Sequence, residues 1–185
     1  MAGNLIEKVE SIYRHLIPLL SRKYLISIKK PLVDSFSEKG NYSKYQAYFV
    51  PCGKCGVVRI SEQAANSQYK IVRLAAHELG HSAIFQNNKF FYSTSSKSID
   101  CLAEGICQDF SLEAAKALHN KRLLSLKDKL LVWLSVQSRS LSSSEEGKGT
   151  RLVRIFKSMN VPVTELILNP ERFKEDISKL YYHKL

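Results

Sequence analysis

The feature that most constrains this chain is a pair of histidines four positions apart in a segment of helical periodicity. His77 and His81 enclose Glu78 in the order H-E-L-G-H, and apolar residues recur at helical spacing through about 66–86. Residues i and i+4 of an α-helix are rotated by about 40° from one another, so the two imidazoles would lie one turn apart on one face. Two neutral imidazoles in that arrangement are typical ligands of Zn²⁺. The sequence therefore predicts a helix that carries two zinc ligands.

Glu78 directly follows the first histidine, which is a suitable position for a general base beside a metal. From there its carboxylate can take a proton from a metal-bound water, whose pKa zinc lowers, without binding the metal itself. Gly80 costs the helix about 1 kcal/mol relative to alanine, but a residue without a side chain lets another segment approach closely. The alternative interpretation is a helix with two surface histidines that bind no metal.

Downstream of the pair, Glu104 is the residue that we expect to complete the site, because a catalytic zinc needs a third protein ligand. It lies in a second helical pattern at about 99–118, and a helix packed antiparallel to the first would return its carboxylate to the metal. Asp100, one turn earlier on the same face, would accept the N–H of a ligating histidine. The other candidates for the third ligand are His119, which ranks second, Asp100 itself, Asp109 and Glu113.

Hydrophobic periodicity elsewhere predicts an α+β domain that is mostly helical, with a small β-hairpin beside the histidine helix. The expected strands are 45–50 and 57–60, joined by a turn with the sequence P-C-G-K-C-G. Polar, Ser-rich segments at 87–98 and about 138–150 are expected to be loops, the second of them flexible. The further expected helices are about 3–21, 121–137, 151–160 and 170–182.

The length and composition indicate a single domain, 1–185, with a core at about 45–120. Hydrophobic residues make up 44% of the 185 residues, which excludes a largely disordered chain, and the apolar runs are too short for a membrane span. The start of the chain lacks the pattern of a secretory signal. We therefore expect a cytoplasmic protein, with export by a signal-independent route as the alternative.

The net charge of +11 is concentrated outside that core. The helical flanks 1–44 and 121–185 carry net charges of +4 and +6, whereas 45–120 carries +1. A basic surface favours anionic partners such as nucleic acid, although no dense Lys/Arg block with interleaved aromatics accompanies it. Solubility alone is the simpler interpretation of this charge.

The segment 57–118 resembles the gluzincin zinc metallopeptidases. The run A-H-E-L-G-H at 76–81, followed by a glutamate on a helix, carries the resemblance. The same six-residue sequence is common in ImmA/IrrE-type peptidases of bacteria and mobile elements. The resemblance implies a zincin-like metallopeptidase domain that binds one Zn²⁺ through both histidines of the pair and Glu104. It also implies that Glu78 is the base and proton shuttle.

The resemblance further implies where a protein or peptide substrate would lie. Val57, Val58, Arg59 and Ile60 would form the edge strand beside which such enzymes bind an extended chain, a known mode of peptide recognition. The position four residues after the ligand glutamate, acidic in many gluzincins, is here Gln108. Most such enzymes also stabilise the oxyanion with a Tyr, His or Arg side chain. The candidates for that donor are Tyr92, His119, Tyr181, Tyr182 and His183.

The expected function is therefore hydrolysis of a peptide bond in a protein substrate, by a zinc-bound water that Glu78 activates. One alternative is a zinc-containing regulatory or toxin-like binding protein, and another is a DNA-associated protease that uses the basic flanks. A bacterial effector or toxin is compatible with these features.

Four cysteines raise the question of a second metal. Cys52 and Cys55 form a C-x-x-C, which is typical of half a zinc site or a redox pair. Cys101 and Cys107 lie on the expected helix of Glu104 and are expected to pack it. Free, partly buried thiols are the expectation, with a four-cysteine zinc site as the alternative.

Overall fold

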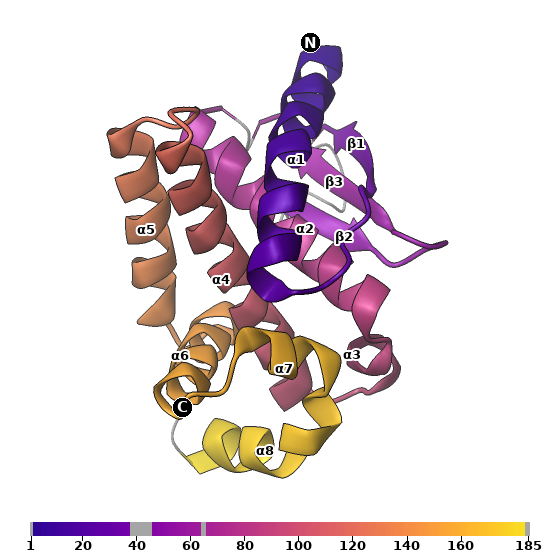
Figure 1. Cartoon of the computed structure of the whole chain (residues 1–185), viewed down its shortest axis with the longest axis vertical. Coiled ribbons are helices and arrows are strands. Elements are labelled where there is room, and N and C mark those ends of the chain that lie inside the picture. The colour runs from indigo at the N-terminus through magenta and orange to yellow at the C-terminus, as the bar shows by residue number, and fades with distance from the viewer. Residues whose placement is uncertain (1, 38–45, 64–65, 184–185) are drawn as a thin grey trace.

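The computed structural model describes residues 2–37, 46–63 and 66–183. In this part of the chain helices build most of the molecule, and a three-stranded sheet lies at one side of it (Figure 1). This confirms the α+β class that is mostly helical. None of these helices combines the length and apolarity needed to cross a membrane. The helices are α1 (Ala2–Tyr24), α2 (Gln68–Asn87), α3 (Phe90–Ser93), α4 (Lys97–Asn120), α5 (Leu126–Ser140), α6 (Glu145–Ser158), α7 (Val163–Leu168), the 3-10 helix η1 (Pro170–Phe173) and α8 (Lys174–His183). The strands are β1 (Leu32–Phe36), β2 (Ala47–Val50) and β3 (Val57–Ser61).

Helix α4 forms the centre of the fold, and α2 packs against it. Both have buried residues on most of their faces, which is typical of helices inside a core. A Cβ added to Gly80 of α2 would lie 2.9 Å from the Cα of Cys107 in α4, so this glycine is required by the close approach. Helix α1 also packs on α2, where the hydroxyl of Tyr13 donates to the carbonyl oxygen of Ala75 at 3.0 Å.

The segment 138–150 was expected to be a flexible loop, and this expectation is wrong because most of it is helical. Ser144 caps the start of α6, where its Oγ accepts the N–H of Gly147 at 3.2 Å. The glycines that suggested a loop serve packing instead. A Cβ on Gly149 would lie 1.9 Å from the carbonyl oxygen of Cys101, so its small size lets α6 lie directly on α4.

The sheet places β3 in the middle, in the order β1-β3-β2. The expected hairpin is confirmed, because β2 and β3 pair antiparallel with Phe49 opposite Val58. Strand β1, which the sequence did not suggest, pairs parallel with β3 and takes its other side. The expectation that 57–60 is an edge strand is therefore wrong, and β1 and β2 are the edges among the described residues. Residue 45, expected to begin the first strand of the hairpin, lies outside the described residues.

Smaller differences concern the boundaries of the helices. Pro18 lies inside α1, which continues to Tyr24. The polar segment 87–98 contains the short helix α3, and α5 begins at Leu126 rather than near residue 121. Helix α7 was not expected at all. These helices surround the α2–α4 pair, which carries the side chains of chemical interest.

Candidate metal centre

Helices α2 and α4 bring together the three side chains expected to bind a metal. His77 and His81 lie one turn apart on α2 with ring centroids 5.1 Å apart, and Glu104 faces them from α4. One carboxylate reaches both rings: Oε2 of Glu104 lies 3.2 Å from Nε2 of His77, and Oε1 lies 3.3 Å from Nε2 of His81. Imidazole nitrogen and carboxylate oxygen are common zinc ligands. The antiparallel return of α4 thus places the third residue where the spacing predicted it.

Burial and charge couple these groups strongly. Burial raises the pKa of Glu104, but His81 and His77 outweigh it and hold that pKa well below its usual range. Burial lowers the pKa of His81, whereas Cys107 and Glu104 outweigh it and raise that pKa well above its ordinary value. A carboxylate between two imidazoles therefore stabilises positive charge at this point, and a metal cation is one way to supply that charge.

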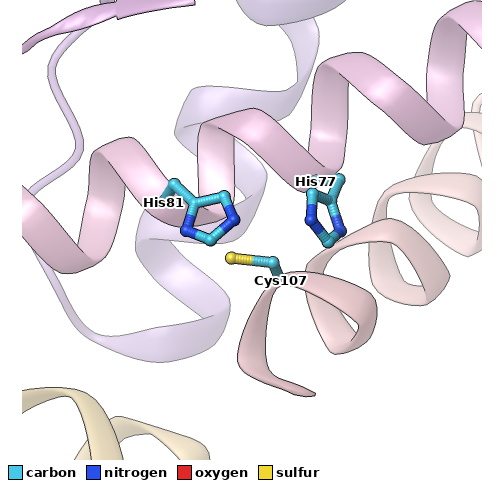
Figure 2. Close-up of side chains that lie close together, drawn as sticks. All are labelled: His77, His81 and Cys107. Carbon is cyan, nitrogen blue, oxygen red and sulfur yellow. The ribbon is translucent and has the colours of Figure 1, made fainter. Parts of the chain in front are cut away.

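Cys107 also lies beside both histidines, although the sequence suggested only a packing role for it. Figure 2 shows its thiol reaching from α4 toward the two imidazoles of α2. Its Sγ and one nitrogen of each ring lie within 4.8 Å of one another. Burial raises the pKa of the thiol to about 11, so without a metal it is protonated at neutral pH. Its position three residues after Glu104, on the same helix face, is the signal that could have identified it.

Glu146 brings a second carboxylate to the centre from α6, and sequence reasoning missed it because it lay in the expected loop. One of its oxygens lies within 4.8 Å of donor atoms of His77 and Glu104. Arg139 of α5 donates to Oε2 of Glu146, and Nε2 of Gln108 donates to the same oxygen at 3.3 Å. Glu146 is therefore held by two donors beside the expected ligands rather than free in solvent.

Glu78 is buried, with 4% of its surface exposed, and it lines the same pocket as the histidines. Burial raises the pKa of its carboxyl group, while the neighbouring histidines act in the opposite direction. A carboxylate with a raised pKa is a better proton acceptor near neutral pH. The position and environment of Glu78 fit the general base that the sequence predicted.

A pocket of about 740 Å³ lies in front of these side chains. It is bordered by residues 47–49 of β2 and by Gln46 just before that strand, by Tyr92 of α3, and by the α5–α6 corner. The corner contributes Arg139 and the first residues of α6. A volume of this order is typical of cavities that bind small molecules or side chains.

Among the expected oxyanion donors, Tyr92 lines this pocket, and its hydroxyl donates to the carbonyl oxygen of His81 at 3.0 Å. Burial raises the pKa of Tyr92, so the hydroxyl stays protonated and able to donate. Tyr181 and Tyr182 line a separate pocket near the start of α4. The side chain of His183 lies outside the described residues.

Asp100 does not support a ligating histidine in the way that the sequence suggested. Its side chain is exposed, and no hydrogen bond joins it to either histidine among the described residues. Nδ1 of His77 is buried without a hydrogen-bond partner. The physical reason is that α4 brings Glu104 to the rings, whereas Asp100 lies one turn away toward solvent.

The other candidate ligands lie away from the centre. Nδ1 of His119 lies 3.1 Å from the carbonyl oxygen of Leu124, at the far end of α4. Asp109 and Glu113 form ion pairs with lysines of other helices. Cys52 is exposed in the hairpin turn. Among the described residues, the groups of side chains that could hold a metal ion include neither Cys52 nor Cys55.

The side chains at the centre fit a zinc ion. Two imidazoles and a carboxylate converge from two buried helices, and the pair of Nε2 atoms faces one carboxylate. The orphaned Nδ1 of His77 indicates that hydrogen bonds within the described protein do not by themselves satisfy this ring. Comparisons of the chain with protein-family models, with curated proteins and with solved structures give no match.

Proposed function

We propose that this chain is a zinc-dependent metallopeptidase of the gluzincin type with a zincin-like fold. The observation that carries the proposal is the reach of one carboxylate, that of Glu104, to both histidines at 3.2 and 3.3 Å. Three protein ligands leave the fourth position of a tetrahedral zinc open, as in catalytic sites. A buried glutamate beside the first histidine and an adjacent pocket supply the base and the space for a substrate.

The side chains divide the chemistry between them. Zinc, when bound, supplies a Lewis acid that polarises the peptide carbonyl and lowers the pKa of water. Glu78 accepts a proton from the attacking water and passes it to the nitrogen of the departing amine, a role that its raised pKa favours. Tyr92 turns from the carbonyl oxygen of His81 to donate to the substrate oxygen as negative charge develops there.

An extended segment of the substrate pairs with the free edge of β2, not with 57–60. Strand β2 is an edge among the described residues, and Ala47, Tyr48 and Phe49 line the pocket. Main-chain hydrogen bonds along a strand edge bind peptides of many sequences, while pockets for alternate side chains add selectivity. The substrate class is therefore a protein or peptide with an exposed, extended segment.

Metal content and cleavage by one preparation test the proposal. Elemental analysis should find one zinc per wild-type chain, and the double variant His77→Ala/His81→Ala should hold none. The same wild-type protein should release fragments from a mixture of unstructured peptides, detected by mass spectrometry, and a chelator should stop the release. Zinc-loaded protein that cleaves nothing would contradict the peptidase, and a chain that takes up no zinc would contradict the metal centre itself.

A structural zinc in a regulatory or toxin-like binding protein is the second candidate, and Glu146 is the observation that favours it. Its oxygen lies within 4.8 Å of donor atoms of His77 and Glu104, close enough to become a fourth protein ligand after a small movement. Zinc with four protein ligands has no position open to substrate. In that case Glu146→Gln would weaken zinc binding as strongly as Glu104→Gln, and the zinc-loaded protein would cleave no peptide.

A further inference from the structure

Arg73 is a buried cation that the proposed reaction does not use. It lies on α2 one turn before His77, it lines the pocket, and only 4% of its surface is exposed. Its Nη2 donates to Oε1 of Gln46 at 3.0 Å. Among the described residues this neutral amide is the hydrogen-bond partner of the guanidinium, and the arginine ion pairs found there involve Arg59, Arg139 and Arg172 but not Arg73.

Such a charge is unusual in a protein interior, because burying an ion without a partner of opposite charge is costly. Burial lowers the pKa of Arg73 to about 10, so the guanidinium is still positive at neutral pH. The charged groups that face it are Arg139, Glu146 and Glu78. The charge of Glu146 is already balanced by its contact with Arg139, and Glu78 is the proton acceptor beside the metal site.

The position of Arg73 gives the pocket two different ends. At one end Arg73 is joined to Gln46, just before β2 begins. At the other end Tyr92, bonded to the carbonyl of His81, packs against Phe49 with ring centroids 6.1 Å apart. The metal ligands lie between these ends, because His77 and His81 follow Arg73 by one and two turns of α2. Strand β2 and helix α2 thus run together from a cationic end to an aromatic end.

We infer that Arg73 binds a carboxylate of the peptide substrate, so that the chain selects peptides with an acidic group on one side of the bond at the metal centre. The inference rests on the proposed function, which supplies the peptide. A guanidinium presents two parallel N–H groups that match a carboxylate, and such bonds are stronger than those between neutral groups. The carboxylate is either an Asp or Glu side chain or the C-terminus of the peptide. The aromatic end receives an apolar side chain on the other side of the bond.

The test measures binding rather than turnover. Fluorescent peptides are titrated, by polarisation, into zinc-supplemented Glu78→Gln protein, which retains the pocket but lacks the base. One peptide pair differs only by Glu or Gln at an internal position, which is scanned along the sequence. A second pair differs only by a free or an amidated C-terminus. At least one carboxylate peptide should bind about 10- to 100-fold more tightly than its neutral partner. The pair that shows the difference identifies the source of the carboxylate.

Variants of the arginine then assign the preference to this side chain. In the Glu78→Gln protein, the further substitution Arg73→Gln should abolish the difference in affinity between the carboxylate peptide and its neutral partner. Arg73→Lys should keep part of that difference, because lysine retains the charge but not the paired donors. The control is Arg172→Gln on η1, an arginine paired with Glu165 and outside the pocket, which should leave the preference unchanged. Zinc content and circular dichroism of each variant verify the fold.

The outcomes separate this inference from the proposed function. Equal binding of both members of every pair, or no binding of any peptide, overturns the carboxylate site, and this comparison needs no arginine variant to fold. A preference that survives in Arg73→Gln also overturns it. If the preference holds but the wild-type chain cleaves none of these peptides, the carboxylate site stands and the peptidase fails. If the wild type cleaves acidic and neutral peptides equally well, the peptidase stands and the carboxylate site fails.

Discussion

The pocket has two walls that are built in different ways. The helical wall consists of α2 and α4 and carries His77, His81 and Glu104. The outer wall consists of β2 and the α5–α6 corner, residues 139–146. The histidine side chains are 8% and 16% exposed and that of Glu104 is 24% exposed, whereas those of Arg139 and Glu146 are 32% and 30% exposed. The comparison indicates that the candidate metal ligands, which require a fixed geometry, are more deeply buried than the charged side chains of the outer wall.

The largest effect, a loss of turnover, is expected from a substitution of Glu78, the proposed general base on the helical wall. Glu78→Gln keeps the shape of the side chain but removes its proton acceptor, so turnover should fall by about 10²- to 10⁴-fold while zinc content stays unchanged. Peptide cleavage and elemental analysis of the same sample measure both quantities. The matched control is Glu113→Gln on α4, an ion-paired glutamate outside the pocket, which should leave turnover unchanged. Full activity of Glu78→Gln would show that the base lies elsewhere.

The second effect concerns the third ligand. Glu104→Gln should weaken zinc binding by more than about 100-fold, because even groups that only support a ligand change metal affinity by about 10- to 100-fold. Competition with a chromogenic chelator gives the affinity. If the affinity does not change, the third ligand is not Glu104, and Cys107, which lies beside both histidines, becomes the first candidate.

A third prediction tests how the outer wall is attached to the helical wall. Gly149→Ala should lower the free energy of unfolding by about 1–3 kcal/mol, because its Cβ would meet the backbone of Cys101. Alanine normally stabilises a helix by about 1 kcal/mol relative to glycine, so a loss of stability isolates the steric effect. Urea denaturation measures it. Ser158→Ala, at the exposed end of the same helix, should stay within about 0.5 kcal/mol. A more stable Gly149→Ala protein would argue against this close approach.

The smallest effect is expected from the carboxylate of the outer wall. Glu146→Gln should weaken zinc binding by less than about tenfold, because Arg139 and Gln108 already hold the carboxylate away from a ligand role. The same chelator competition compares it directly with Glu104→Gln, an identical chemical change on the other wall. Equal losses in the two variants would remove the distinction between the walls and favour the structural zinc.

Much of the helical wall could be predicted because its information is local. The i, i+4 spacing places the two histidines on one face of α2, and the small residue Gly80 anticipates the approach of α4. Glu104 was found by its distance along the chain and by the helical pattern around it. Cys107 was missed, although its three-residue spacing from Glu104 holds the same kind of information. If the whole face of α4 that carries Glu104 had been taken as a source of ligands, Cys107 would have been among the candidates.

The outer wall was predicted poorly because its geometry depends on contacts between distant segments. Strand β1 lies in a polar stretch without clear alternation, so the central position of β3 could not be foreseen. Gly147 and Gly149 suggested a loop, whereas they allow α6 to lie on α4. The run Ser144-Glu145-Glu146 is a signal for the start of a helix that could have corrected this reading.

The sequence by itself determined the class of the fold and the helix with its two histidines and the glutamate between them, because helical periodicity and spacing are properties of neighbouring residues. The tertiary structure alone decided which strand has a free edge at the pocket, and it alone brought Glu146 and Gln108 together from two helices. It also left Arg73 facing the pocket with a neutral partner. These features depend on which surfaces pack together, and packing is settled by the shape and burial of the whole chain.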